Sequence, residues 1–367
     1  MTDDLLQSPL HDRHVALGAR FAEFGGWSMP LQYAGVVPEH TAVRTGVGIF
    51  DVSHLGKVVV RGAGAAAYVN RTLSNDLGRI GPGRAQYTLC LEPATGGIVD
   101  DIFSYVRSDE DVLLVPNASN NTEVHRRLAA EAPDGVEVVN EHRDHVILAV
   151  QGPRSDETLD AAGLPTGHDY LTFVEAAFEG QPVIVCRTGY TGERGYELIA
   201  PNAVAGPLWD AIMAAGAAYD IAPCGLGARD TLRTEMGYPL HGQDISPSVT
   251  PNEARLGWAV GWKKDGFWGR DAVVAEKAAG ARRKLIGLRS TGRAIPRPHM
   301  AVSLAPDVRV GEVTSGTFSP TLKQGIALAL VSTSVPDDGE LSVDVRGRQE
   351  AFSVQKPPFV DPSVRES

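Results

Sequence analysis

Two adjacent acids stand out because the segment around them is otherwise apolar. Asp100 and Asp101 occur in "GGIVDDIFSYV" (96–106), where most other residues are β-branched or aromatic. Such residues favour a β-strand, and two glycines favour a turn before it. Asp100 would then share one face with Ile98, and Asp101 the other face with Val99.

A buried carboxylate without partners is costly in free energy. At least one of the two acids is therefore expected to be paired, to have a shifted pKa, or to face a cleft where a ligand meets it. A neighbouring turn or an ion pair with an arginine would also account for the acids, since structural ion pairs perturb carboxyl groups as well.

Further polar residues occur in apolar or glycine-rich surroundings. In "RTGYTGERGYELIA" (187–200), Tyr190 lies between glycines expected to let the backbone turn sharply, and Glu197 lies inside a predicted strand. In "CGLGARDTLRTEMG" (224–237), Arg229 lies near the start of a predicted helix. A cation there opposes the helix dipole, so an acidic or planar polar partner is expected. A structural ion pair would explain each residue alone.

Taken together, these residues predict a pocket for a neutral, planar, hydrogen-bonding heterocycle. A carboxylate accepts hydrogen bonds from an amino group and an adjacent ring N–H as it accepts the two prongs of an arginine. Pterins and purines both fit this description, and the residues alone do not choose between them.

The usual motifs for nucleotides and metals are missing from the sequence. "GAGAAAY" (62–68) lacks the spacing of a dinucleotide fingerprint. "GYTGERG" (189–195) is predicted to lie between two strands, where no helix dipole would hold a phosphate. His142 and His145 have the separation of metal ligands, but no third ligand lies nearby in the sequence. We predict neither a metal nor a nucleotide.

Composition and charge narrow the class of protein. The chain has 367 residues, of which 43% are hydrophobic, enough for a sizeable core and two or three domains. A net charge of −11 makes nucleic acid an unsuitable partner. Cys90, Cys186 and Cys224 are far apart and are expected to be buried thiols. We expect a cytoplasmic protein without a membrane segment, because no stretch reaches the length of a membrane helix.

The predicted elements change in character along the chain. A helix is predicted over "HVALGARFAEF" (14–24) and a loop over the proline-containing "WSMPLQYAGVVPEH" (27–40). From about residue 56, strands alternate with helices in an α+β unit with antiparallel strands, and "HVILAVQGP" (145–153) opens a second sheet. Beyond a helix that ends at Gly280, short strands between Gly and Pro turns predict a C-terminal β-barrel or sandwich.

The sequence resembles the T-protein family of the glycine cleavage system, aminomethyltransferases that use tetrahydrofolate. The stretches that carry the resemblance are "LGARFAEFGGWSMPLQY" (17–33), "GIFDVSHLGK" (48–57), "GGIVDDI" (96–102), "LAVQGP" (148–153), "RTGYTGERGYEL" (187–198), "GLGARDTLRTEMGYPLHGQDI" (225–245) and "TSGTFSPTLKQGIALALV" (314–331). They occur in the order of the family and cover all the domains expected here.

The resemblance implies an α+β fold, a three-domain cloverleaf around a central folate cavity. Residues 1–55 with 145–250 would form a first, discontinuous α+β domain. Residues 56–144 with 251–280 would form a second α+β domain, which we expect to be ferredoxin-like. Residues 281–361 would form the C-terminal β-barrel.

The resemblance also implies roles for the unusual polar residues. Asp101 would be the catalytic acid, close to N10 and the reacting carbon of the folate. Glu197 would hold the pterin amino group and ring N–H, and Tyr190 and Arg229 would be further cofactor-binding residues of the same pocket.

Two more cofactor-binding residues are implied, Tyr87 and Asn117, which would line the same cavity. The residue before Asn117 departs from the family. Pro116 stands where many relatives carry valine in a strand, and a proline would remove an N–H from the strand ladder.

The implied reaction takes an aminomethyl group from the lipoyl arm of the H protein to tetrahydrofolate, the co-substrate. Ammonia leaves and 5,10-methylenetetrahydrofolate forms. The lipoylated H protein would be the partner, and Arg365 is one candidate for a basic patch that meets it.

Two other functions fit a folate pocket. One is a folate-dependent demethylase of a free substrate, and the other is a non-enzymatic folate-binding protein. "DVSHLGK" (51–57) and "HGQDI" (241–245) favour the glycine cleavage branch. The cysteine-containing folate loop that we associate with non-enzymatic relatives is missing, and the presence of Asp101 favours catalysis.

Overall fold

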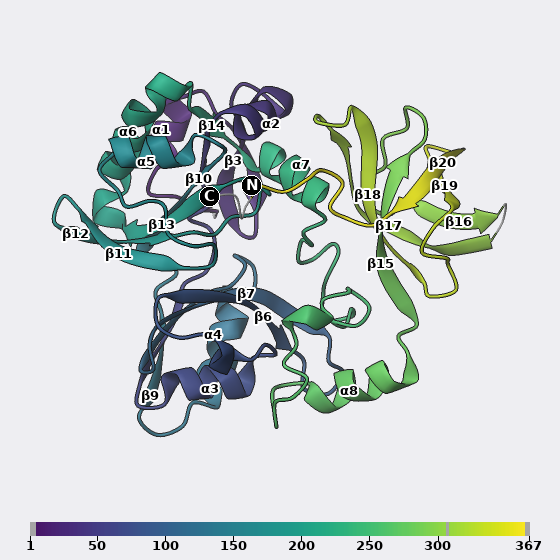
Figure 1. The fold of residues 1–367 in the computed structure, drawn as a ribbon, viewed down its shortest axis with the longest axis horizontal. Helices are drawn as coiled ribbons and strands as arrows, with labels where there is room; N and C mark the ends of the chain where they lie inside the picture. Colours follow the sequence, from purple (N-terminus) through teal and green to yellow (C-terminus); the bar gives the residue numbers. More distant parts are fainter. Residues whose placement is uncertain (1–4, 306–307, 364–367) are drawn as a thin grey trace.

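The structure, a computed structural model, describes residues 5–305 and 308–363. Its helices and strands form three groups around a common centre (Figure 1). Two groups combine sheets with helices and the third is a closed barrel of strands, so the expected α+β class and the C-terminal barrel are confirmed. The boundaries of the three domains stay a prediction.

The first group is built on a six-stranded sheet that is covered on both faces. Its strands, in spatial order, are β11 (Phe173–Phe178), β12 (Gln181–Cys186), β13 (Gly195–Pro201), β10 (His145–Gln151), β4 (Gly48–Asp51) and β14 (Ala222–Cys224). Helices α5 (Ser155–Ala161) and α6 (Ala205–Gly216) accompany it. Trp209 of α6 packs in one core with Leu148, while Ile147 and Ile199 point into a separate core on the other face. Two-sided burial explains why β10 and β13 are apolar at nearly every position.

The N-terminal region corrects two predictions. The helix predicted over residues 14–24 is wrong beyond α1 (His11–Ala16), because Gly18, with φ +74°, ends it and β2 (Arg20–Phe24) follows. The loop predicted over residues 27–40 is wrong as well, since that stretch forms β3 (Trp27–Gln32) and the start of α2 (Val36–Thr45).

The prolines in this region are accommodated rather than excluded. Pro30 lies in β3 at a register shift of a small sheet with the order β1 (Leu6–Gln7), β3, β2, so a regular ladder is not interrupted there. Pro38 lies in the first turn of α2, where a backbone N–H has no partner within the helix.

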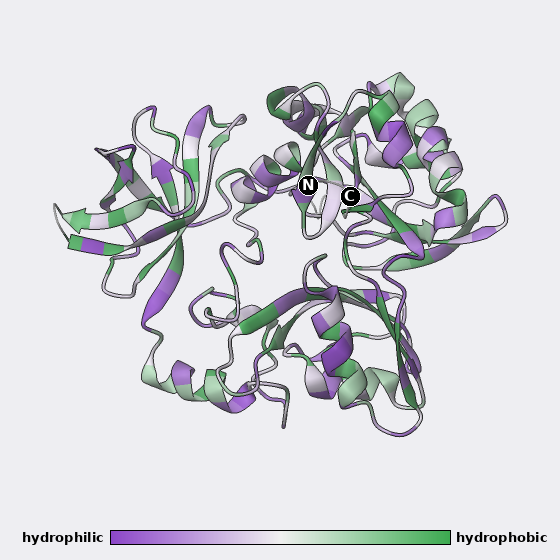
Figure 2. Ribbon diagram, turned by 180° about the vertical axis from the view of Figure 1, so that it is seen from behind, coloured by the Kyte–Doolittle hydropathy of each residue, from purple (hydrophilic) through white to green (hydrophobic). Residues whose placement is uncertain are grey.

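The second group is a five-stranded antiparallel sheet with helices on one face. Its strands, in spatial order, are β6 (Arg84–Leu91), β7 (Ile98–Ser108), β8 (Asp111–Val115), β5 (Val58–Gly62) and β9 (Val136–Asn140). Helices α3 (Ala65–Thr72) and α4 (Asn121–Ala130) contribute Tyr68 and Leu128 to its core. Hydrophobic residues alternate with hydrophilic ones along the helices (Figure 2), as expected where one helix face packs on a sheet.

Strand β7 contains a β-bulge that changes which residues share a face. Cys90 pairs with Asp100, but the next residue of β6 pairs with Ile98, which leaves Val99 as the extra residue. Val99 therefore packs in the same core as Ile102, and Ile98 packs in another. The predicted faces of Ile98 and Val99 are wrong for this reason.

The third group is a closed six-stranded barrel. Its strands, in spatial order, are β15 (Arg283–Ser290), β18 (Gln324–Ser332), β17 (Val308–Ser319), β16 (Ala301–Ala305), β19 (Glu340–Val345) and β20 (Arg348–Gln355). Helix α8 (Arg270–Ala279) precedes it and is followed by Gly280, as predicted. Helix α7 (Leu226–Met236) lies between the first group and the barrel (Figure 1). In the described part of the chain, no helix is long and apolar enough to cross a membrane.

A close backbone contact fixes β7 against the segment that follows α7. The backbone N–H of Ile98 donates to the carbonyl oxygens of Ser246 (3.1 Å) and Val249 (3.0 Å). The preceding residue is Gly97, and a Cβ added there would lie 1.8 Å from the carbonyl oxygen of Pro247. Only a residue without a side chain allows this approach.

Gly97→Ala is therefore expected to destabilise the protein by about 1–3 kcal/mol, because the backbone of the facing segment must move to admit the methyl group. Thermal unfolding measures the loss. Gly81→Ala is the matched control, since a Cβ at Gly81 meets no atom within 4 Å. Equal unfolding temperatures for the two variants would contradict the prediction.

Candidate active site

A cavity of about 360 Å³ lies where the first and second groups meet, next to α7. It shares Tyr87, Asp101, Phe103 and Tyr190 with a second cavity of about 710 Å³. The residues predicted from the sequence that line the first cavity are Tyr87, Asp101, Asn117, Tyr190, Glu197 and Arg229. The structure thus brings all six together from β6, β7, the segment after β8, the loop before β13, β13 and α7.

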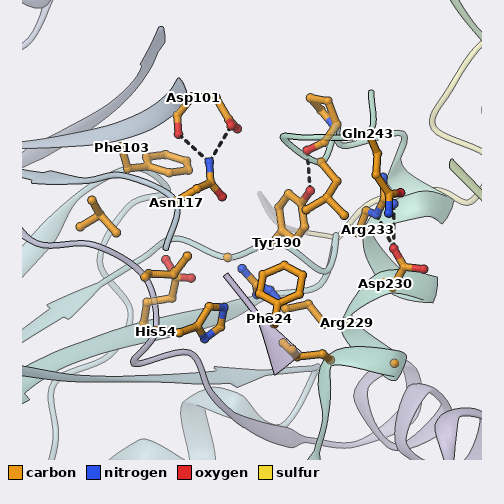
Figure 3. A pocket seen from close by; sticks show the side chains of 18 of the residues that line it. Phe24, His54, Asp101, Phe103, Asn117, Tyr190, Arg229, Asp230, Arg233 and Gln243 are labelled. Atoms are coloured by element: carbon orange, nitrogen blue, oxygen red, sulfur yellow. Dashed lines mark hydrogen bonds and ion pairs between the residues drawn. The ribbon is translucent and has the colours of Figure 1, made fainter. Parts of the chain in front are cut away.

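Asp101 faces the cavity and is held by a phenol and an amide. Tyr87 donates its hydroxyl hydrogen to Asp101 Oδ2 (3.1 Å), and Asn117 Nδ2 donates to Asp101 Oδ1 (2.8 Å). Figure 3 shows Asp101 and Asn117 on the side of the cavity opposite to His54 and Arg229. Neither donor is a cation, so these two hydrogen bonds orient the carboxylate through uncharged groups.

Asp100 points to the other face of β7 and is completely buried. It accepts hydrogen bonds from the backbone N–H of Asn117 (2.9 Å), from Asn117 Nδ2 (2.7 Å) and from Asn120 Nδ2 (2.7 Å). The amide of Asn117 therefore bridges the two acids. Asp100 supports the wall of the cavity from behind, and Asp101 forms its surface.

Burial changes the proton affinity of both acids. It raises the pKa of Asp100 to about 7, with the charge of Asp101 acting in the same direction. It also raises the pKa of Asp101, against the charge of His241 and the hydrogen bonds from Tyr87 and Asn117. A carboxyl group with a raised pKa can accept and return a proton near neutral pH.

The segment after β8 shows why Pro116 is tolerated. Strand β8 ends at Val115, so Pro116 lies beyond the ladder, and its carbonyl oxygen accepts a hydrogen bond from the N–H of Gly56 (2.7 Å). The predicted loss of a ladder N–H is wrong for this reason. Asn117, the next residue, still reaches both acids.

The wall formed by the first group carries Glu197, whose residue is 8% exposed. Glu197 Oε2 accepts a hydrogen bond from Thr188 Oγ1 (2.7 Å). The guanidinium of Arg229 lies 4.6 Å above the ring of Tyr190, which is a planar partner of the kind that its helix position predicts. Nη1 of Arg229 is buried and has no hydrogen-bond partner among the residues that the structure describes. A ligand with a hydrogen-bond acceptor could satisfy it.

The glycines around Tyr190 have different functions from one another. Gly192, with φ +83°, provides the predicted turn. Gly189 and Gly195 instead make room for Gln151, since a Cβ on either would lie 2.1 Å or 2.6 Å from its amide. The sharp turn expected at all three glycines is thus found at one of them.

Several cavity residues were not predicted, among them Phe24, His54, Phe103 and Tyr105. Phe103 and Tyr105 alternate with Asp101 along β7, so the strand period could have indicated them. Phe24 was missed because a helix was predicted over residues 14–24, whereas Phe24 ends strand β2. The ring of Phe24 packs edge-on against His54 (5.3 Å).

Burial favours the neutral form of two histidines near the cavity, His54 and His142. Burial lowers the pKa of His54 to about 3. The ring Nε2 of His142 is 2.8 Å from the carbonyl oxygen of His54, and burial lowers the pKa of His142 too. In the part of the chain that the structure describes, no group of three or more His, Cys, Asp or Glu residues could hold a metal ion.

Comparisons with known proteins cover nearly the whole chain. Residues 10–264 match the GCVT N-terminal domain, and residues 283–361 match the glycine cleavage T-protein C-terminal barrel domain. The chain is 62% identical to the aminomethyltransferase of Frankia alni, over 99% of this chain and 100% of that protein. It is 57% identical to the aminomethyltransferase of Mycobacterium tuberculosis strain H37Rv, over 99% of each.

A solved structure shows the same fold. The crystal structure of glycine cleavage system aminomethyltransferase T from Bartonella henselae matches with a TM-score of 0.92 and 33% sequence identity. The match covers 98% of this chain and 99% of that chain.

The two sheet groups, the closed barrel and the cavity between them, with these matches, define a group-transferring enzyme. The chain belongs to the glycine cleavage T-protein family, and its activity is that of an aminomethyltransferase. The resemblance stated from the sequence is confirmed. The demethylase and the non-enzymatic binding protein are not supported by these matches.

The buried Asp100 makes stability depend on pH in a defined window. The folded protein keeps the proton of Asp100 up to about pH 7, whereas an unfolded chain releases it near pH 4. Between these values the unfolded state binds fewer protons, so this group reduces stability as the pH rises. The Asp100→Asn variant does not titrate at this position.

The free energy of unfolding of the wild type, relative to Asp100→Asn, is therefore expected to fall as the pH rises from about 4 to about 7 and to level off above that. Urea unfolding of both proteins across this range measures the difference, in which titrating groups remote from Asp100 cancel. A difference that does not change with pH would contradict the raised pKa.

Proposed function

We propose that the cavity binds tetrahydrofolate and that the chain transfers to it the one-carbon unit of the aminomethyl group carried by the lipoylated H protein. Ammonia and 5,10-methylenetetrahydrofolate are the products. One observation supports this above all others: Asp101 and Glu197, on strands of two different sheets, line the same cavity. The hydrogen bonds to the two carboxylates come from uncharged groups, namely Tyr87 and Asn117 at Asp101 and Thr188 at Glu197.

The two acids would have different functions. Glu197 would accept hydrogen bonds from the amino group and ring N–H of the pterin, which present two donors side by side. The unpartnered Nη1 of Arg229 would donate to an acceptor on the same ring system. The two connected cavities are of the size that small-molecule sites usually have.

The transfer requires positioning and the movement of protons. The methylene carbon forms bonds to N5 and N10 of the folate, and its bonds to the amino nitrogen and the lipoyl sulfur break. The protons that N5 and N10 lose are gained by the ammonia and the thiol. Asp101 would orient N10 and accept its proton as the ring closes, and no protein nucleophile is needed.

Holding the reacting atoms in line would supply most of the acceleration. Proton transfer by a positioned side chain typically adds about a hundredfold to ten-thousandfold. Tyr87 and Asn117 would keep Asp101 in the required orientation through the hydrogen bonds described above.

Two further expectations concern the surroundings of the enzyme. Cys90, Cys186 and Cys224 are free and buried, which supports the proposal of a reducing compartment such as the cytoplasm. Arg365, a candidate for contact with the H protein, lies outside the described residues.

Asp101→Asn is expected to leave tetrahydrofolate binding largely intact and to reduce transfer by about a hundredfold to ten-thousandfold, because asparagine keeps the shape of the side chain but cannot accept the proton. Calorimetric titration measures binding, and ammonia release with aminomethylated H protein measures transfer. Asp111→Asn, outside the cavity, is the control. Equal loss of binding and transfer would show that Asp101 serves binding instead.

Glu197→Gln is expected to weaken tetrahydrofolate binding by about tenfold to a hundredfold, because one of the two charge-assisted hydrogen bonds is lost. The turnover number should fall much less than the affinity. The same titration and ammonia assay measure both quantities. Unchanged affinity would place the pterin away from Glu197.

A further inference from the structure

A chain of two buried hydroxyl groups lies behind Glu197. Thr188 Oγ1 donates to Glu197 Oε2 (2.7 Å), and the hydroxyl of Tyr105 lies 3.2 Å from Thr188 Oγ1. Tyr105 and Thr188 are each 2% exposed. The chain therefore runs from Tyr105 on β7 of the second group to Glu197 on β13 of the first, with little exposure to solvent.

The direction of each hydrogen bond follows from the number of hydrogens. A threonine hydroxyl has one hydrogen, and the carboxylate of Glu197 takes it. Thr188 Oγ1 can then only accept from Tyr105, whose hydroxyl donates. Burial raises the pKa of Tyr105, so its hydroxyl keeps the hydrogen that this arrangement requires.

Both ends of the chain are fixed by neighbouring groups. The carbonyl oxygen of Thr188 accepts a hydrogen bond from Gln151 Nε2 (3.2 Å), and Gln151 Oε1 accepts another from Thr191 (2.8 Å). The ring of Tyr105 packs edge-on against Phe173 (5.8 Å). Neither hydroxyl can turn away without leaving its partner unpaired, which is costly in a buried place.

The position of Tyr105 links the two acids of the cavity. Tyr105 lies four residues after Asp101 on β7, and both side chains line the cavity. A displacement of β7 would therefore move Asp101 and, through Thr188, also Glu197. Strand β7 thus carries Asp101 and, through Tyr105 and Thr188, also helps to orient Glu197.

We propose that Thr188, supported by Tyr105, is a positioning residue for tetrahydrofolate: its hydroxyl occupies one lone pair of Glu197 Oε2 and so fixes the plane in which both carboxylate oxygens face the pterin. This inference rests on the proposed function. It extends that function by assigning the affinity for the pterin to a residue that lies behind the carboxylate.

Thr188→Val tests the inference, because valine has the shape of threonine without its hydroxyl. The expected result is an increase of about tenfold in both the Kd and the KM for tetrahydrofolate, with a change of less than about threefold in kcat. Thr188→Ser keeps a hydroxyl and is expected to restore most of the affinity. If Thr188 served only the stability of the fold, its replacement would not raise KM while leaving kcat nearly unchanged.

A double variant separates positioning from stability. Thr188→Val removes the hydroxyl to which Tyr105 donates and leaves the Tyr105 hydroxyl only the weaker contact with Cys186, which destabilises the fold. Tyr105→Phe combined with Thr188→Val removes both hydroxyls, so thermal stability is expected to recover while the affinity for tetrahydrofolate stays low. If the double variant regained affinity together with stability, the inference would be overturned. A Thr188→Val variant with the KM and Kd of the wild type would overturn it as well.

The proposed function and the positioning role fail in different ways. A wild type that binds tetrahydrofolate but releases no ammonia with aminomethylated H protein would refute the proposed transfer, and the Kd values of the variants would still decide the role of Thr188. A wild type that does not bind tetrahydrofolate would overturn both.

Discussion

The cavity depends on two carboxylates, one buried and one partly buried, whose direct hydrogen bonds come from uncharged groups. Taking an ionised carboxylate out of water costs several kcal/mol unless hydrogen bonds or charges replace the water. Amide and hydroxyl groups replace part of it here, namely Asn117 and Tyr87 at Asp101 and Thr188 at Glu197. The acids are thus held in place while part of their hydrogen-bonding capacity stays available to a ligand.

The fold meets this requirement by letting each sheet supply one acid. Strand β7 of the second group carries Asp101, and β13 of the first group carries Glu197, so the space between them is set by how the two sheets pack. The bulge at Val99 rotates only the start of β7 and keeps Asp101 in phase with Phe103 and Tyr105. Both faces of the strand are then used, one for the hydrophobic core and one for the cavity.

The sequence could indicate the unusual residues because they break local patterns. Acids within apolar strands and an arginine near a helix start are visible without any structure, and alternation along β7 correctly predicts that Asp101 and Phe103 share a face. These residues indicate a planar heterocycle but do not separate a pterin from a purine, because the two offer similar hydrogen-bond donors. The resemblance to the T-protein family is what favours the pterin of tetrahydrofolate over a purine.

What could not be predicted depends on contacts between distant segments. Strand β2 was missed because a helix was predicted over residues 14–24, and β3 because Pro30 and Pro38 were expected to prevent regular structure, whereas pairing across a small sheet accommodates Pro30. The bulge on β7 follows from its register with β6, which no local pattern encodes. The chain of hydroxyls behind Glu197 joins residues of two sheets, and neither Thr188 nor Tyr105 is unusual in its own segment.

The barrel acts on the cavity indirectly, through α7. Among the described residues that line the two cavities, none belongs to a barrel strand. Arg233 of α7 does line the first cavity, and its guanidinium donates to Asp244 (2.8 Å) and to Ser315 Oγ of β17 (2.7 Å). One turn of the helix before it lies Arg229. A buried arginine with a carboxylate partner loses much free energy if it is displaced, so these contacts fix the helix that carries Arg229. The barrel therefore helps to set the position of one cavity wall, although none of its described strand residues lines the cavity.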